Sequence, residues 1–230
     1  MIFEKNIYEA IFISRPNRFN AIVLLNDEEI VVHVPNTGRC KEILIKGTKV
    51  FLREENNPNR KTKYDLIAAY KGDILINIDS QIPNKVVNEA LLNKKIKELE
   101  KFNIINTEKT FGKSRFDFML STEKNENYYL EVKGVTLEDK GLCKFPDAPT
   151  ERGAKHILEL IEAKRLGYGA GILFLIQLDN VKSFSPNEVT DPNFTNALKL
   201  AHKNNIDIMV YSCRVGENYI ELKEKVNLIL

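Results

Sequence analysis

The sequence predicts an α+β chain of two domains, a small β domain over residues 1–83 and a larger α/β domain with a mixed sheet over residues 84–230. Three observations carry this prediction. Six short runs rich in β-branched and aromatic residues, separated by turn-forming clusters, precede residue 84. A helical pattern and three consecutive strand-like runs follow. Toward the C-terminus, strands alternate with helices, which is typical of parallel strands joined by helical crossovers.

The first domain is expected to be a small barrel or sandwich, because six short strands at this spacing are typical of such folds. The expected strands cover residues 8–14, 21–25, 29–34, 48–53, 64–70 and 73–78. Between the third and fourth, Asn36-Thr37-Gly38 reads as a turn whose glycine suits a positive φ. His33 is expected to be a core or barrel-mouth residue.

The second domain is expected to open with a helix over residues 84–102, followed by strands over 104–111, 114–121 and 128–137. A second helix begins at or near Thr150 and stops at Gly167, with Ile157, Leu158 and Ile161 as its apolar stripe. A strand over 170–178 comes next. Asp191 then caps a third helix, and strands over 206–213 and within 219–230 complete a mixed sheet flanked by helices.

Composition excludes several classes of protein. The 34 basic and 32 acidic residues leave a formal net charge of +2, so any basic surface for a nucleic acid must be local. No apolar run approaches the length of a membrane span, and no leader pattern opens the chain, so we expect a cytoplasmic protein without a membrane partner. Cys40, Cys143 and Cys213 lie too far apart for a metal knuckle and are expected to be buried free thiols.

Charged residues interrupt two adjacent strands of the second domain. Asp117 lies in the first of them, and Glu131 and Lys133 share one face of the second, while Phe116 and Phe118 are expected to point away from Asp117. The three charges converge only in a hairpin register whose paired residue numbers sum to an even value.

Convergent carboxylates form a site for a hard divalent cation such as Mg²⁺, and Lys133 could orient a water molecule or stabilise charge on a phosphate. The alternative is a surface hairpin with a solvated Asp117 and a simple Glu131–Lys133 pair.

An acid, an intervening turn and Glu-x-Lys on the next strand, between two helices, resemble the PD-(D/E)XK nuclease superfamily. The resemblance implies a further acid from the preceding helix. We assign this role to Glu89, with Glu98 and Glu100 as competitors. It also implies polar groups on the following helix, where Arg152, His156 and Glu159 lie along one side, away from Ile157 and Ile161.

A more specific resemblance covers nearly the whole chain. The motifs are SRPNRF, HVPNTGR, KTKYDL, PNKVVNEAL, SRFDF, LEVKGVTL, FPDAPTERGAKH, FLIQ and DPNF, and their order is similar to that of the sugar fermentation stimulation protein A family. This resemblance implies an OB-like N-terminal barrel, a PD-(D/E)XK nuclease-like C-terminal domain and DNA binding. The family's names refer to maltose metabolism and its regulation.

Basic side chains could form a DNA-binding face although the first domain is not basic overall, because its acids cluster elsewhere. Phe19 or Tyr64 could stack on bases; the alternative is a set of solvated loops. Asp147 is a secondary candidate for metal or DNA contacts. The expected DNA-binding residues are Arg15, Arg18, Arg39, Arg60, Lys61, Lys63, Arg152 and His156.

The leading functional hypothesis is therefore a DNA nuclease that uses Mg²⁺ or Mn²⁺. Asp117, Glu131 and Glu89 would hold the metal and Lys133 would assist the attacking water. The competing hypothesis is a DNA-binding regulator of sugar metabolism genes that keeps a nuclease-like fold without turnover. A third hypothesis, a sugar-converting enzyme, is supported by no motif. The sequence leaves open whether the chain forms a homo-oligomer.

Overall fold

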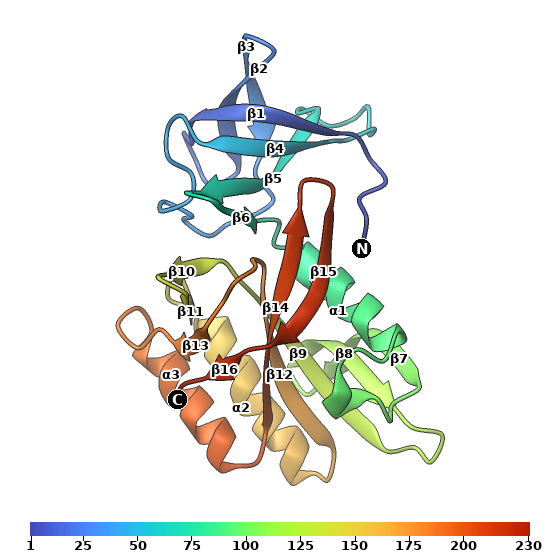
Figure 1. Cartoon of the computed structure of the whole chain (residues 1–230). Coiled ribbons are helices and arrows are strands. Elements are labelled where there is room, and N and C mark those ends of the chain that lie inside the picture. Colours follow the sequence, from blue (N-terminus) through green and yellow to red (C-terminus); the bar gives the residue numbers. More distant parts are fainter.

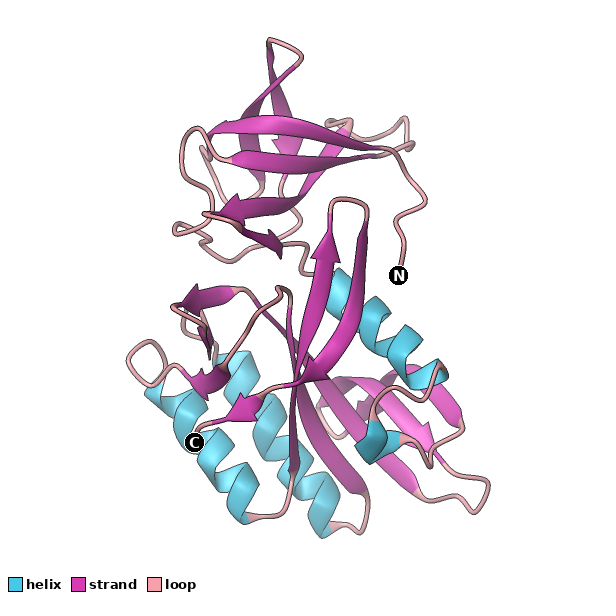
Figure 2. Cartoon of the chain, viewed as in Figure 1, coloured by secondary structure: helices cyan, strands magenta, loops and turns pink.

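The computed structural model describes all residues from Met1 to Leu230 and contains two domains stacked end to end (Figure 1). The N-terminal domain is built of strands alone, and the C-terminal domain carries the helices (Figure 2). No helix is both long and apolar enough to cross a membrane.

The N-terminal domain is a closed barrel, as predicted. Its sheet runs in the order β3-β2-β1-β4-β5, and a pairing of His33 with Asp65 joins β3 back to β5. The tight β2–β3 turn uses Asn26 and Asp27, both at positive φ, as two-residue hairpins prefer. The strands are β1 (Ile7–Ser14), β2 (Asn20–Leu25), β3 (Glu28–His33), β4 (Lys49–Glu54), β5 (Tyr64–Lys71) and β6 (Ile74–Asn77).

The C-terminal domain is built on a six-stranded mixed sheet in the order β15-β14-β12-β9-β8-β7, which confirms the predicted architecture. Strands β7 to β9 form the antiparallel meander, while β12 pairs in parallel with β9 and β14. The strands are β7 (Ile104–Phe111), β8 (Ser114–Ser121), β9 (Asn127–Val135), β12 (Gly169–Ile176), β14 (Asp207–Gly216) and β15 (Tyr219–Lys225).

Helices cover both faces of this sheet. One apolar cluster joins α1 (Ile82–Leu92) to the face that carries Leu130 and Leu173, and the other joins α2 (Glu151–Arg165) and α3 (Pro192–Lys203) to the opposite face. Thr150 caps α2 and Asp191 caps α3, both as predicted. The Asp191 carboxylate also accepts a hydrogen bond from the Thr150 N–H at 2.7 Å, so one side chain ties the two helix starts together.

The first helix is shorter than predicted. It ends at Leu92 rather than near Phe102, because Asn93 closes it and Lys94 adopts a left-handed φ of 54°; a separate 3-10 turn, Lys97–Leu99, follows. The stripe predicted for α2 also needs correction, because Leu158 is 49% exposed and Leu160 takes its place in the core.

A second, small sheet was not predicted. Its strands are only two to four residues long, so no period of two is legible in them. They are β10 (Leu137–Asp139), β11 (Leu142–Phe145), β13 (Ser183–Pro186) and β16 (Asn227–Leu228).

The two domains are fastened by a buried amide at the end of β12. Gln177 Nε2 donates to the Asn77 and Asp79 carbonyl oxygens and to Asn77 Oδ1, at 3.0 to 3.1 Å. The Asn77 N–H donates in return to the Gln177 carbonyl. From the barrel side, Arg53 pairs with the fully buried Asp79 at 2.9 Å. The segment between the domains is therefore fixed by hydrogen bonds to both of them.

Candidate active site

Asp117 and Glu131 meet where strands β8 and β9 separate. The regular ladder runs from Ser121–Asn127 to Phe118–Leu130, all sums of 248, so the register is the even one that convergence requires. Beyond Phe118 the pairing stops, and the Asp117 carboxylate accepts the Val132 N–H at 2.8 Å. The side chain thus replaces a backbone partner, which holds Asp117 beside Glu131.

The side-chain alternation along β8 breaks at Asp117. Phe118 packs in the apolar cluster on the α1 face, whereas Phe116 packs in the other cluster, beside the ring of His156. The prediction that both phenylalanines point the same way was wrong: the pairing of β8 with β9 ends at Phe118, and on the other side Glu108 of β7, opposite Asp117, has a left-handed φ of 52°. This irregularity lets Asp117 reach both β9 and α1, where Asn84 Nδ2 donates to its other oxygen at 2.7 Å.

Glu131 is buried, and its two oxygens have different surroundings. Oε1 lies 2.5 Å from Lys133 Nζ and 2.6 Å from His156 Nδ1. Oε2 is buried without any hydrogen-bond partner. Since buried carboxylate oxygens are almost always satisfied, an orphaned one beside a second carboxylate suits a cation.

The two carboxyl groups titrate in opposite directions. Burial, and then the charge of Glu131, raise the pKa of Asp117 against the hydrogen bonds from Val132 and Asn84. Burial also pushes the pKa of Glu131 upward, but His156 and Lys133 outweigh it, so that pKa lies below its usual range. Glu131 is therefore ionised at neutral pH, whereas ionising Asp117 beside it costs free energy.

Glu89, predicted as the third acid, does not join this pair. Its half-exposed carboxylate lies 2.9 Å from the amino group of Met1, and no three acidic, histidine or cysteine side chains form a metal-binding group. Asn84 makes the contact from α1 instead. Five residues of α-helix turn the chain by about 140° beyond a full circle, so Asn84 and Glu89 cannot face the same point.

The other helix acids are also engaged elsewhere. Glu98 accepts from the Tyr211 hydroxyl and pairs with Lys225, and Glu100 pairs with Lys97. Asn84 could not be singled out from the sequence, because an asparagine near the start of a helix more often serves as a capping residue.

His156 was predicted to contact DNA, and the structure corrects this assignment. The ring is buried against Glu131, because α2 turns this residue toward the sheet next to Ile157. Arg152, one turn earlier, is exposed and donates from Nε to His156 Nε2 at 3.3 Å. Because Nε2 accepts this bond, Nδ1 is the ring nitrogen that donates to Glu131.

Three of the predicted DNA-binding arginines gather in one pocket of the barrel. A cavity of about 240 Å³ is lined by Arg15, Arg18, Arg39 and Lys41, and by no acidic residue. Arg15 is structural, because its guanidinium donates to four backbone carbonyls of the surrounding loops. Arg18, Arg39 and Lys41 are exposed and form no ion pair. Lys41 was missed, although it lies two residues after Arg39.

The other residues of the barrel predicted to bind DNA lie outside this pocket; they are Arg60, Lys61 and Lys63. Arg60 is held by Asp65 and Glu55, and Lys63 pairs with Glu54 at 2.9 Å. Only Lys61 of this group is exposed without an ion pair. Phe19 is 47% exposed beneath the guanidinium of Arg18, so it remains a candidate for base stacking, whereas Tyr64 packs edge-on against Tyr8.

Asp147 connects the barrel loop to the second domain. Its Oδ2 accepts the Arg39 N–H at 3.2 Å, and a Cβ at Gly38 would lie only 2.5 Å from that oxygen. Gly38 does not have a positive φ, so the turn prediction was wrong about its purpose: the glycine permits a close approach. A cavity of about 180 Å³ beside this contact extends to Gly134, the residue after Lys133.

All three cysteines are buried free thiols, as predicted. Burial raises the pKa of Cys40 and of Cys143 to about 12. Protonated, inaccessible thiols do not act as nucleophiles or as metal ligands, so none of the three cysteines is a candidate for either role.

Two family models match consecutive parts of the chain. A model described as the SfsA N-terminal OB domain matches residues 13–78, and one described as the sugar fermentation stimulation protein RE domain matches residues 81–219. The chain belongs to the sugar fermentation stimulation protein (SfsA) family. The resemblance drawn from the motifs is thereby confirmed, as is the predicted fold of an OB barrel followed by a mixed-sheet α/β domain.

SfsA relatives match this chain over its whole length. A homolog from Clostridium novyi is 67% identical over 225 residues, which are 98% of both chains. One from Clostridium perfringens is 64% identical over 230 residues, or 100% of both. The solved structure of Pyrococcus furiosus SfsA is 27% identical, covers 100% of both chains and superposes with a TM-score of 0.90.

Proposed function

We propose that the protein is a divalent-cation-dependent nuclease that acts on DNA, with its reaction centre at Asp117, Glu131 and Lys133. The observation that carries this proposal is the buried, unpartnered Oε2 of Glu131 beside Asp117. A carboxylate pair that only stabilised the fold would be expected to satisfy both of its members.

The residues present fit Mg²⁺ or Mn²⁺. Mg²⁺ binds in proteins through one or two carboxylates and completes its shell with water and substrate phosphates, so two acids suffice. Asp117 and Glu131 would hold the ion without Glu89. The Pyrococcus furiosus relative is a complex with Ca²⁺, another hard cation that takes oxygen ligands, and this supports a cation site in the family.

Each residue has a defined part in the proposed reaction. The bound cation would polarise the scissile phosphate and lower the pKa of a coordinated water. Lys133 lies half-buried against Glu131, where its ammonium would orient the attacking water and stabilise negative charge on the phosphate. His156 donates a hydrogen bond from Nδ1 to Glu131 and keeps that carboxylate aligned. Asn84 aligns the Asp117 carboxylate through a hydrogen bond from Nδ2.

The basic pocket of the barrel supplies the binding surface for DNA. The side chains of Arg18, Arg39 and Lys41 form no ion pair, and the β3–β4 loop that carries Arg39 and Lys41 touches Asp147 and reaches the cavity beside Gly134. A DNA strand whose phosphates bind there would extend toward the end of β9, where Glu131 and Lys133 lie. This arrangement supports binding that weakens steeply with salt.

The test is a cleavage assay on single-stranded, duplex and branched DNA, with Mg²⁺ or Mn²⁺ or with a chelator. We expect metal-dependent cleavage that falls by about 10² to 10³ in Lys133→Met, the usual loss when one charge-stabilising donor is removed. Asp117→Asn should be inactive. Glu89→Gln is the matched control from α1 and should cleave normally.

A DNA-binding regulator without turnover is the second candidate. Both oxygens of Asp117 already accept hydrogen bonds, from Asn84 and from Val132, and this favours it, because a carboxylate satisfied in this way can keep the fold without binding a metal. DNA binding that survives in every variant, with no cleavage of any substrate in either metal, would establish the regulator and reject the nuclease.

A further inference from the structure

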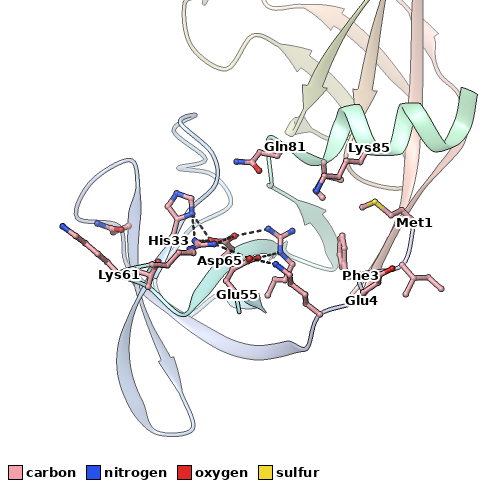
Figure 3. Close-up of a pocket in the computed structure, with 16 residues that line it drawn as sticks. Met1, Phe3, Glu4, His33, Glu55, Lys61, Asp65, Gln81 and Lys85 are labelled. Carbon is pink, nitrogen blue, oxygen red and sulfur yellow. Dashed lines mark hydrogen bonds and ion pairs between the residues drawn. The ribbon is translucent and has the colours of Figure 1, made fainter. Parts of the chain in front are cut away.

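A third cavity, of about 700 Å³, lies between the two domains and includes none of the residues of the proposed reaction centre. Three separate segments enclose it (Figure 3). His33, Glu55 and Asp65 lie on the barrel side, Gln81 and Lys85 on the side of α1, and the segment from Met1 to Lys5 closes the third side.

The acidic groups on the barrel wall are already neutralised. Asp65 is bound by His33 Nδ1 at 2.8 Å, by Arg53 Nη2 at 3.0 Å and by Arg60. Burial alone would raise the pKa of Asp65, but Arg60, His33 and Arg53 hold it below its usual range. Glu55 is likewise paired with Arg53 and Lys5. These carboxylates would therefore repel an incoming anion only weakly.

Glu4, on the N-terminal segment, is exposed and forms no ion pair. The other groups without partners are mainly hydrogen-bond donors. Lys61 and Lys85 line the cavity and form no ion pair. The amides of Asn20 and Gln81 also border the space. His33 donates from Nδ1 to Asp65, which leaves its Nε2 free as an acceptor, for instance for a hydroxyl group. In addition, α1 begins here with no side chain capping its first turn. A wall of this kind recognises an anion rich in oxygen.

The size of the cavity exceeds that of a bare phosphate. Small-molecule sites typically span about 300–1,000 Å³. Phe3 and Ile82 supply an apolar wall on which a ring can lie. We propose that this cavity binds a nucleotide through its terminal phosphate, with Lys61 and Lys85 on the phosphate, His33 as a further contact and Phe3 against the base. The proposal does not depend on cleavage at Asp117.

The test uses adenosine monophosphate as the probe and calorimetry in the presence of a chelator, so that no metal can hold the phosphate at Glu131. The full chain should bind it in the micromolar to millimolar range, and adenosine at least about tenfold more weakly, or 1.4 kcal/mol. Lys85→Ala should weaken binding by at least a similar factor. Lys203→Ala, an exposed lysine at the end of α3, is the control and should bind like the parent.

The nucleotide could be free or could be the phosphorylated end of a DNA strand, and a second arm separates these sources. A 5′-phosphorylated oligonucleotide is compared with the same strand ending in a hydroxyl. A Lys85-dependent preference for the phosphorylated strand, competed by adenosine monophosphate, identifies a DNA end; a preference confined to the mononucleotide identifies a free ligand. The proposal is overturned if Lys85→Ala, correctly folded by circular dichroism, changes neither interaction.

Discussion

Glu131 shows how a single side chain can be held ready for a ligand. Lys133 and His156 fix one of its oxygens and leave the other buried and free. The period of two along a strand predicted that Asp117, Glu131 and Lys133 converge. It could not predict Asn84 or the inward turn of His156, because both depend on how each helix is rotated against the sheet.

The electrostatic coupling of the two carboxylates gives a first prediction. Because the charge of Glu131 raises the pKa of Asp117, Glu131→Gln should move the pKa of Asp117 down, toward its usual range. Carbon-13 NMR of the Asp117 carboxyl group, titrated without metal, measures the shift. An Asp117 pKa that stays in place or rises would show that the two groups do not interact.

The same coupling predicts that Asp117 destabilises the metal-free protein. A raised pKa means that the ionised side chain costs free energy at neutral pH, and the cost disappears as the pH falls through the folded pKa toward the normal one. Asp117→Asn should therefore raise the melting temperature at pH 7, by roughly 2–4 °C for each kcal/mol relieved. The gain should vanish in acid. A variant that melts lower at pH 7 would contradict this.

Glu131 has the opposite effect on stability. Its pKa lies below the normal value, so its contribution is present above the normal glutamate pKa and is lost as the pH falls through the folded one. Glu131→Gln should consequently lower the melting temperature at pH 7 and matter less in acid. Opposite pH dependences for the two variants are the signature expected in calorimetric scans.

At the level of elements, the starts of α2 and α3 and the end of α2 near Gly167 were predictable, whereas the bounds of α1 were not. Thr150 and Asp191 signal their caps in the sequence, because short polar side chains satisfy the N–H groups of a first turn. The end of α1 depends on the left-handed conformation of Lys94, and a lysine at this position does not predict such a conformation. The small second sheet could not be predicted either, because the pairings of β11 with β13 and of β13 with β16 join segments that are distant in sequence.

The double role of Asp191 can be tested directly. Asp191→Ala removes the cap of α3 and the acceptor for the Thr150 N–H, and should cost about 2 kcal/mol or more. Asp191→Asn keeps the cap and should cost clearly less. Chemical denaturation measures both, and equal losses would mean that the contact with Thr150, rather than the cap, carries the stabilisation.

For the molecule as a whole, the relation between the domains rests on a few buried polar contacts. Both domains could be predicted from the spacing of strands and helices, but their junction could not. Gln177 lies 98 to 100 residues from the atoms it binds, and no local pattern marks it. The need for a glycine at position 38 could not be predicted either, because it arises from the close approach of the Asp147 carboxylate, which leaves no room for a Cβ.

Gln177 should therefore control how firmly the domains are joined. Gln177→Glu would place a carboxylate against three oxygen acceptors, at a cost of about 1–3 kcal/mol for each unsatisfied group, and should expose residues 77–81 to hydrogen exchange and proteolysis. Gln177→Met, which removes the amide without adding charge, should have a smaller effect. Unchanged exchange in both variants would show that other contacts hold the junction.

The most direct measurement of the proposed centre is a calorimetric titration of the protein with Mn²⁺ in the absence of DNA. One ion per chain should bind, and binding should be lost in Asp117→Asn and in Glu131→Gln but retained in Glu89→Gln. Binding that persists in the first two variants, or that disappears only in Glu89→Gln, would contradict a cation site formed by Asp117 and Glu131.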